Sequence, residues 1–155
     1  MILIVNDDAL ACSQLADALR AAGHRDFECC NVTQAYQQAV SSRPGLIVIV
    51  VRHRGTGGIV LAASLRIGDQ TSMIPIIVMS PHEEHRRLQA MLARFGVRAL
   101  LGEPFGPSDV IALIDLALGP NARPGQIPLP QAPPAAGEQT GWRASLAMND
   151  TESGE

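Results

Sequence analysis

The chain contains no lysine, and its 12 strongly basic side chains are all arginines. A bias of this kind is typical of a GC-rich genome rather than of a particular function. The formal net charge is only −3, and no basic stripe runs along the sequence. Binding to nucleic acid depends on neutralising phosphates, so we do not expect it here. No apolar run approaches the roughly 20 residues of a membrane span, so we expect no membrane contact either.

Cysteine is also scarce, and Cys12, Cys29 and Cys30 are the only three. Apolar residues make up 46% of the 155 positions. A domain of this size buries roughly two-thirds of its unfolded surface and folds without disulfides or metal. Met1 leads into a strand with no basic flank or cleavage site, so we expect no signal peptide and a cytoplasmic location. The cysteines are then expected to be reduced, small core residues; the alternative is a redox or metal-binding role.

Four apolar runs each lead into a polar cluster. They cover residues 2–5, 46–51, 74–79 and 97–101. Strands that are apolar at every position are typical of parallel sheets covered on both faces. Strand and helix patterns alternate five times, which predicts an α/β fold with a doubly wound, five-stranded parallel sheet, flavodoxin-like (βα)5, strand order 2-1-3-4-5. The second strand, over residues 26–31, is the least apolar and is expected at an edge.

Capping and spacing signals define the helices between these strands. Asp8 and Thr33 are predicted to cap the first and second helices, and Gly23 to end the first. A fourth, amphipathic helix is expected over residues 83–95. In the third helix the side chains expected to face inward are Ile59, Leu61, Leu65 and Ile67. In the last helix they are Val110, Leu113, Ile114, Ala117 and Leu118.

The composition changes after residue 119. Residues 120–155 hold six of the eleven prolines and show no apolar periodicity. We therefore expect a folded domain over 1–119 and a Pro-rich, disordered tail over 120–155. The only tryptophan, Trp142, lies in this tail. It is either a solvated side chain or part of a short motif that becomes ordered on a partner.

Residues 1–119 resemble the receiver domain of bacterial response regulators. That family has an acidic pair after the first strand, a phosphate-accepting Asp after the third, a Ser or Thr after the fourth and Lys-Pro-Phe after the fifth. The positions that correspond here, in order, are Asn6-Asp7, Val50, Ser80 and Glu103-Pro104-Phe105. Gly58, eight residues past Val50, matches the glycine that opens the third helix of the family. The resemblance implies the same fold and a place in two-component signal transduction.

The same positions depart from what phosphoryl transfer requires. In the family the reaction needs a carboxylate nucleophile, Mg²⁺ and a positive charge that faces the phosphate. Val50 has no nucleophilic atom and removes a metal ligand, so Asp7 and Asp8 are weak Mg²⁺ candidates. Glu103 replaces the family lysine, and Leu100 stands where many members carry an aromatic residue that changes position. We therefore expect no catalysis, no cofactor and no metal site, and we interpret these positions, with Asp8 and Pro104, as a relic of a phosphorylation site.

Two clusters of charged residues follow the third and fourth strands, near the expected crevice at the strand ends. Arg52 and Arg54 follow Val50 and are expected to bind an anion, or to fix the loop by pairing with Asp7, Asp8 or Glu103. The alternative to a relic site is therefore a repurposed pocket. His82-Glu83-Glu84-His85 lacks the spacing of the His-Glu-x-x-His zinc motif, and we do not predict a metal site there.

The sequence therefore predicts a degenerate receiver, a cytoplasmic signalling module that acts by protein contacts and not by catalysis. Receivers commonly dimerise or bind partners through the fourth helix, fifth strand and fifth helix. The residues expected to give specificity there are Arg86, Arg87, Arg94 and Asp115. The alternative function is a flavodoxin-like sensor domain that binds a small ligand or anion in the strand-end crevice.

Overall fold

The structure is a computed structural model, and it describes residues 1–51, 56–80, 97, 99–102 and 105–119. The strands are β1 (Ile2–Val5), β2 (Phe27–Cys30), β3 (Leu46–Val50), β4 (Ile76–Ser80) and β5 (Ala99–Gly102). The helices are α1 (Ala9–Ala21), α2 (Val32–Ser42), α3 (Gly57–Ile67) and α5 (Pro107–Leu118). The helix expected over 83–95 and the tail lie outside the described residues.

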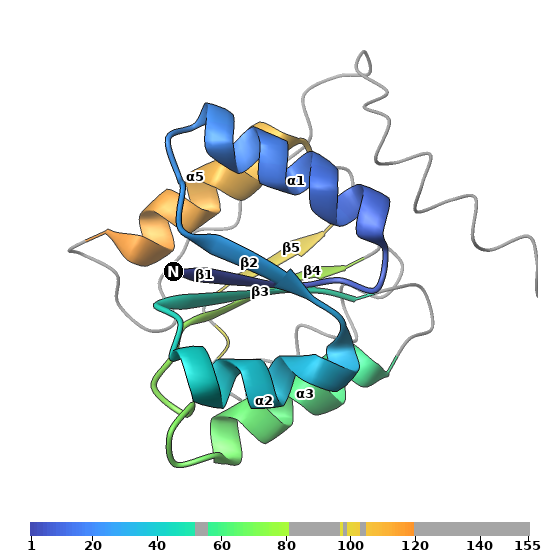
Figure 1. The fold of residues 1–155 in the computed structure, drawn as a ribbon, viewed down its shortest axis with the longest axis vertical. Coiled ribbons are helices and arrows are strands. Elements are labelled where there is room, and N and C mark those ends of the chain that lie inside the picture. The colour runs from blue at the N-terminus through green and yellow to red at the C-terminus, as the bar shows by residue number, and fades with distance from the viewer. Residues whose placement is uncertain (52–55, 81–96, 98, 103–104, 120–155) are drawn as a thin grey trace, which may run out of the picture.

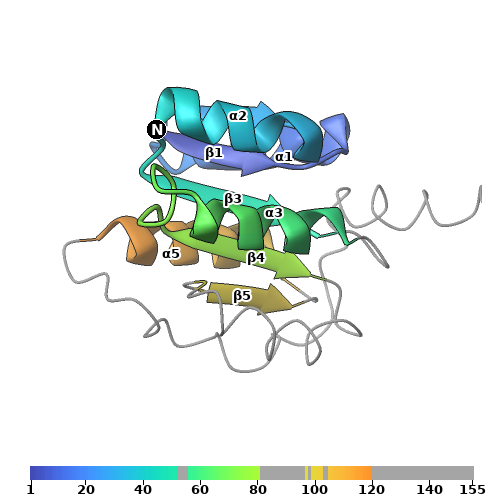
Figure 2. The ribbon, with the colours of Figure 1, turned by 90° about the horizontal axis from the view of Figure 1, so that it is seen from below.

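All strand pairs are parallel, in the order β2-β1-β3-β4-β5, which confirms the predicted topology. Helices α1 and α5 cover one face of the sheet, and α2 and α3 cover the other (Figure 1). Figure 2 shows β1, β3, β4 and β5 one after another in that order. β2 lies at the edge, as expected, and its side chains are the least buried of the strands whose side chains are fully described.

Two apolar layers hold the sheet between these helices. Alternate residues of β1 and β3, such as Ile4 and Val48, belong to the layer under α1 and α5. Their neighbours Val5 and Ile49 belong to the layer under α2 and α3. The period of two along a strand produces this division, and full burial on both faces explains why the strands are apolar throughout.

The helix ends show which local signals were predicted correctly. Asp8 caps α1 as expected, and Gly23 follows the helix with φ +95°, where a side chain would be strained. Asn31, and not Thr33, caps α2: the Asn31 Oδ1 accepts from the Gln34 amide at 2.9 Å and from the Thr33 hydroxyl at 2.7 Å. The prediction for Thr33 was wrong because Asn31, two residues earlier, supplies the capping oxygen.

Two apolar side chains at helix ends were also misplaced. Ile67 is 80% exposed, and Leu118 is partly exposed as well. Each is the last residue of its helix. Ile67 follows the buried Leu65 by two positions, and residues two apart do not share a helix face. The remaining apolar positions predicted for α5 are buried.

The cysteines correct a further prediction. Cys12 in α1 and Cys29 in β2 form a disulfide, with their Cα atoms 6.5 Å apart, and Cys30 is the free thiol. The reason lies in the sheet register. Cys29 pairs with Ile4, whose side chain faces α1, whereas Cys30 pairs with Val5 on the opposite face. A separation of 17 residues gave no sign of this contact in the sequence.

Candidate functional site at the carboxyl edge of the sheet

The candidate site lies where three neighbouring strands end. β1 leads into Asn6, Asp7 and Asp8, β3 ends at Val50, and β4 ends at Ser80. The order β1-β3-β4 places these ends side by side. In parallel α/β sheets this edge is where ligands and catalytic residues lie. The structure therefore brings together the positions that the sequence selected, apart from Glu103, Pro104, Arg52 and Arg54, which lie outside the described residues.

The oxygen atoms of the β1–α1 loop are directed at backbone amides. The Asp8 Oδ1 accepts from the amides of Leu10 and Ala11, at 2.9 and 3.1 Å, and so caps α1. The Asn6 Oδ1 accepts from the amide of Asp8 at 3.0 Å. The Asp7 Oδ1 accepts from the Val32 amide at 3.0 Å, which ties the loop to the first residue of α2. These contacts give the loop a structural role.

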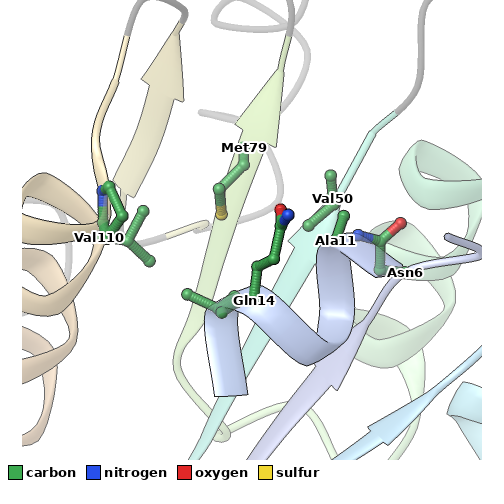
Figure 3. A pocket seen from close by; sticks show the side chains of 8 residues that line it. Asn6, Ala11, Gln14, Val50, Met79 and Val110 are labelled. Carbon is green, nitrogen blue, oxygen red and sulfur yellow. The ribbon is translucent and has the colours of Figure 1, made fainter. Parts of the chain in front are cut away.

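Val50 belongs to the core rather than to an exposed catalytic edge. Its side chain is 9% exposed and packs in the apolar layer with Met79 and Val110. The same three residues line a cavity of about 30 Å³ between α1, α5 and the sheet (Figure 3). Gln14 extends its side chain into this cavity, and its Oε1 is buried without a protein partner. A volume of this size holds about two water molecules, and a drug-sized ligand needs at least about tenfold more.

A magnesium ion does not fit the donor set that the structure describes. Mg²⁺ requires near-octahedral oxygen ligands, usually one or two carboxylates together with water. The Oδ1 atoms of Asp7 and Asp8 accept from backbone amides, Asn6 is uncharged, and Val50 contributes only carbon. Across the described part of the chain, no three His, Cys, Asp or Glu side chains gather as a metal centre would require.

Ser80 is the last residue of β4, and Asp115 lies on α5. Ser80 is 2% exposed, and within the described structure its hydroxyl has no hydrogen-bond partner. Asp115 is on the solvent side of α5, and its Oδ1 lies 2.8 Å from the His24 Nε2 in the α1–β2 connection. An exposed pair of this kind contributes about 1 kcal/mol at most. Arg86, Arg87, Arg94 and the His82–His85 segment lie outside the described residues.

Sequence reasoning missed Gln14, Met79 and Val110 as lining residues of the cavity. A faint signal existed for Gln14: it follows Ala11 by three positions, so it shares the sheet-facing side of α1. Nothing in the sequence indicated that its amide oxygen would be left without a partner.

Comparison with known proteins agrees with this geometry. The family model described as response regulator receiver domain matches residues 2–115. The chain is 34% identical over 118 residues to the phosphate regulon transcriptional regulatory protein PhoB of Pseudomonas aeruginosa, covering 76% of this chain and 51% of PhoB. It is 31% identical over 118 residues to the KDP operon transcriptional regulatory protein KdpE of Escherichia coli, covering 76% and 50%. The chain thus spans about half the length of these curated relatives.

Solved structures show the same fold. The chemotaxis response regulator CheY4 of Vibrio cholerae superposes with a TM-score of 0.64 at 20% identity, covering 74% of this chain and 94% of CheY4. The signal receiver domain of a signal transduction histidine kinase from Syntrophus aciditrophicus gives 0.66 at 22% identity, covering 83% and 97%. The protein is therefore a member of the response regulator receiver domain family, a class of two-component signalling domains. In the described residues, no helix is long and apolar enough to cross a bilayer.

Proposed function

We propose that this domain is a degenerate receiver that signals through protein–protein contacts without phosphorylation of an aspartate. The observation that carries the proposal is Val50: at the position that corresponds to the acceptor, the side chain is apolar and packed into the core. Phosphoryl transfer requires a carboxylate there, together with metal and positive charge. The domain is then a non-enzymatic, cytoplasmic module of a bacterial two-component-type pathway.

The partner is a signalling protein or a second copy of this chain. We propose that it binds the surface formed by residues 83–95, β5 and α5, with Arg86, Arg87, Arg94 and Asp115 supplying specificity. Neither nucleic acid nor membrane is a partner in this proposal, because the chain is acidic overall. Within the described residues, the cavity beside Val50 gives no support to the alternative of a small-ligand sensor, because about 30 Å³ is too small for an organic ligand. A thermal-shift screen with anions, nucleotides and Mg²⁺ tests that alternative directly.

The experiment is an affinity capture with the full chain as bait, in the presence and absence of beryllofluoride and Mg²⁺, which mimic a phosphorylated aspartate. We expect one signalling protein, or the chain itself, to be captured equally in both conditions. A variant with Arg86→Ala, Arg87→Ala and Arg94→Ala should lose it. The matched control is Arg20→Ala, which removes an exposed arginine from α1. Capture that requires beryllofluoride would contradict independence from phosphorylation.

Removal of residues 120–155 should change the melting temperature by less than about 2 °C. A Pro-rich segment without apolar periodicity buries little apolar surface, and burial of such surface is the main source of stability. Differential scanning calorimetry of the full chain and of a chain that ends at Gly119 measures the effect. A fall of many degrees would mean that the tail packs on the domain, and Trp142→Ala would then show whether the indole is responsible.

A further inference from the structure

The disulfide between Cys12 and Cys29 connects α1 to the edge strand of the sheet. Cys12 is 5% exposed and lies on the buried side of α1, one turn after the cap, where its amide donates to the Asp8 carbonyl at 3.0 Å. Cys29 lies in the exposed middle of β2. One half of the bond is thus shielded and the other is accessible from solvent. Thiol–disulfide exchange depends on such access, because the attacking thiolate must reach one of the two sulfur atoms.

Cys30 does not compete for this bond, although it is the neighbour of Cys29. Its side chain points to the opposite face of the sheet and packs against the layer under α2 and α3. Burial, with help from Glu28 and Asp7, raises the pKa of the Cys30 thiol to about 11. The thiolate is the reactive form, so Cys30 is roughly 100-fold less ionised at neutral pH than a thiol of pKa 9.0. Geometry and acidity together leave Cys12 and Cys29 as the exchanging pair.

We propose that Cys12 and Cys29 form a thiol–disulfide exchange site whose co-reactant is a small thiol of the glutathione type. In the reductive direction a glutathione thiolate attacks the Cys29 sulfur, and the sulfur of Cys12 leaves and takes up a proton. A second glutathione thiolate attacks the mixed disulfide, which releases Cys29 as a thiol and forms glutathione disulfide. Two electrons and two protons move from two glutathione molecules to the protein, and the oxidative direction is the reverse.

The cytoplasmic location in the proposed function is the reason to expect exchange rather than a permanent bond. Disulfides that form in reducing compartments are usually transient, catalytic or redox-sensing. The inference rests on the proposed function in that one respect. Exchange is measured on the isolated chain, without a partner. Its failure would therefore leave the partner experiment untouched, and failure of the partner experiment would leave exchange untouched.

The Cys12–Cys29 disulfide restrains the β1–α1 loop because it joins the beginning of α1 to β2. β2 lies at the edge of the sheet, beside β1 alone. Another contact between α1 and β2 is the Arg20 guanidinium, 5.1 Å from the centre of the Phe27 ring, near the far end of the helix. The disulfide fixes the beginning of α1, next to Asp8. The preceding residue, Asp7, accepts a hydrogen bond from the Val32 amide and so links the same loop to α2. Reduction should therefore loosen the loop that carries both aspartates.

The test equilibrates the full chain with mixtures of reduced and oxidised glutathione and counts thiols by alkylation and intact mass. We expect interconversion within mixtures that a reducing cell can reach, with two thiols gained on reduction. The melting temperature should fall by about 8–10 °C, because opening a loop of 17 residues releases chain entropy in the unfolded state. Cys30→Ser should behave like the wild type, whereas Cys29→Ser should form no intramolecular disulfide and Cys12→Ala should stop at the mixed disulfide of Cys29 with glutathione.

Hydrogen exchange provides the second measurement. On reduction the amides of Leu10, Ala11 and Val32 should lose protection, whereas the amides of β3 and β4 should not. If the disulfide stays intact in excess reduced glutathione, it is purely structural. If Cys12 and Cys29 stay reduced in excess glutathione disulfide, they form no disulfide. Either result overturns the proposal. Interconversion without any change at Leu10, Ala11 and Val32 would overturn the coupling to the loop.

Discussion

Incubation with acetyl phosphate and Mg²⁺ will leave the intact mass of this protein unchanged. The reason is atomic: Val50, at the position corresponding to the acceptor, offers only carbon, and the Asp8 Oδ1 accepts two helix amides. Transfer in the family requires a nucleophile, metal and positive charge together, and mass spectrometry under non-hydrolysing conditions reports the product directly. A stoichiometric added phosphate that maps to Asp7 or Asp8 would contradict the prediction.

Restoring the acceptor alone should achieve little. Val50→Asp supplies the nucleophile, but Glu103 still presents a negative charge where the family has lysine, and Asn6 still lowers the charge available to hold Mg²⁺. Val50→Asp combined with Glu103→Lys should give measurable labelling, and adding Asn6→Asp should raise it further. Val50→Asn with Glu103→Lys is the matched control, since it has nearly the same shape as the aspartate variant and no nucleophile. Equal labelling of Val50→Asp and the double variant would show that Glu103 does not oppose the phosphate.

The fold was largely predictable because it follows from local sequence patterns and from general rules for connecting parallel strands. Apolar runs bounded by polar clusters gave the strands, and right-handed crossovers left one strand order. Errors appeared where a long-range or competing contact decides the outcome. Ile67 fits the apolar composition of α3 but ends it on the exposed side. Asn31 displaced Thr33 as the cap because either side chain can supply the oxygen.

The convergence of the described strand ends could be predicted from the sequence, but the contacts that their side chains make could not. Strand ends converge in any parallel sheet, so Asn6, Val50 and Ser80 could be grouped from the sequence. That Asp7 would reach the Val32 amide depends on how α2 sits beside the loop, and this follows from packing. To predict the Cys12–Cys29 bond, one must know both the register of β2 and the rotation of α1 about its axis. The spacing of the cysteines in the sequence gives neither.

Val50→Asp should lower the free energy of unfolding at pH 7 by about 3–4 kcal/mol, because it buries a carboxylate without a partner. The described surroundings of Val50 are mainly apolar: Leu15, Met79 and Val110 line the same cavity, and its polar lining consists of the neutral amides of Asn6 and Gln14. Without a cation, these amides do not offset the full cost of burying an ionised carboxylate. Urea denaturation of the wild type and the variant measures the difference.

Two controls separate charge from shape in this experiment. Val50→Ala removes only packing and should cost about 1–2 kcal/mol, and Val50→Asn has nearly the shape of aspartate without its charge. Burial raises the pKa of an introduced carboxyl group above its value in the unfolded chain. The charge penalty is then full above the folded pKa and disappears below the unfolded pKa, so the gap between Val50→Asp and Val50→Asn should close as the pH falls toward about 4. A gap that is absent at pH 7 would mean that the carboxylate finds a cation or reaches water, and position 50 would then be a polar site that valine merely occupies.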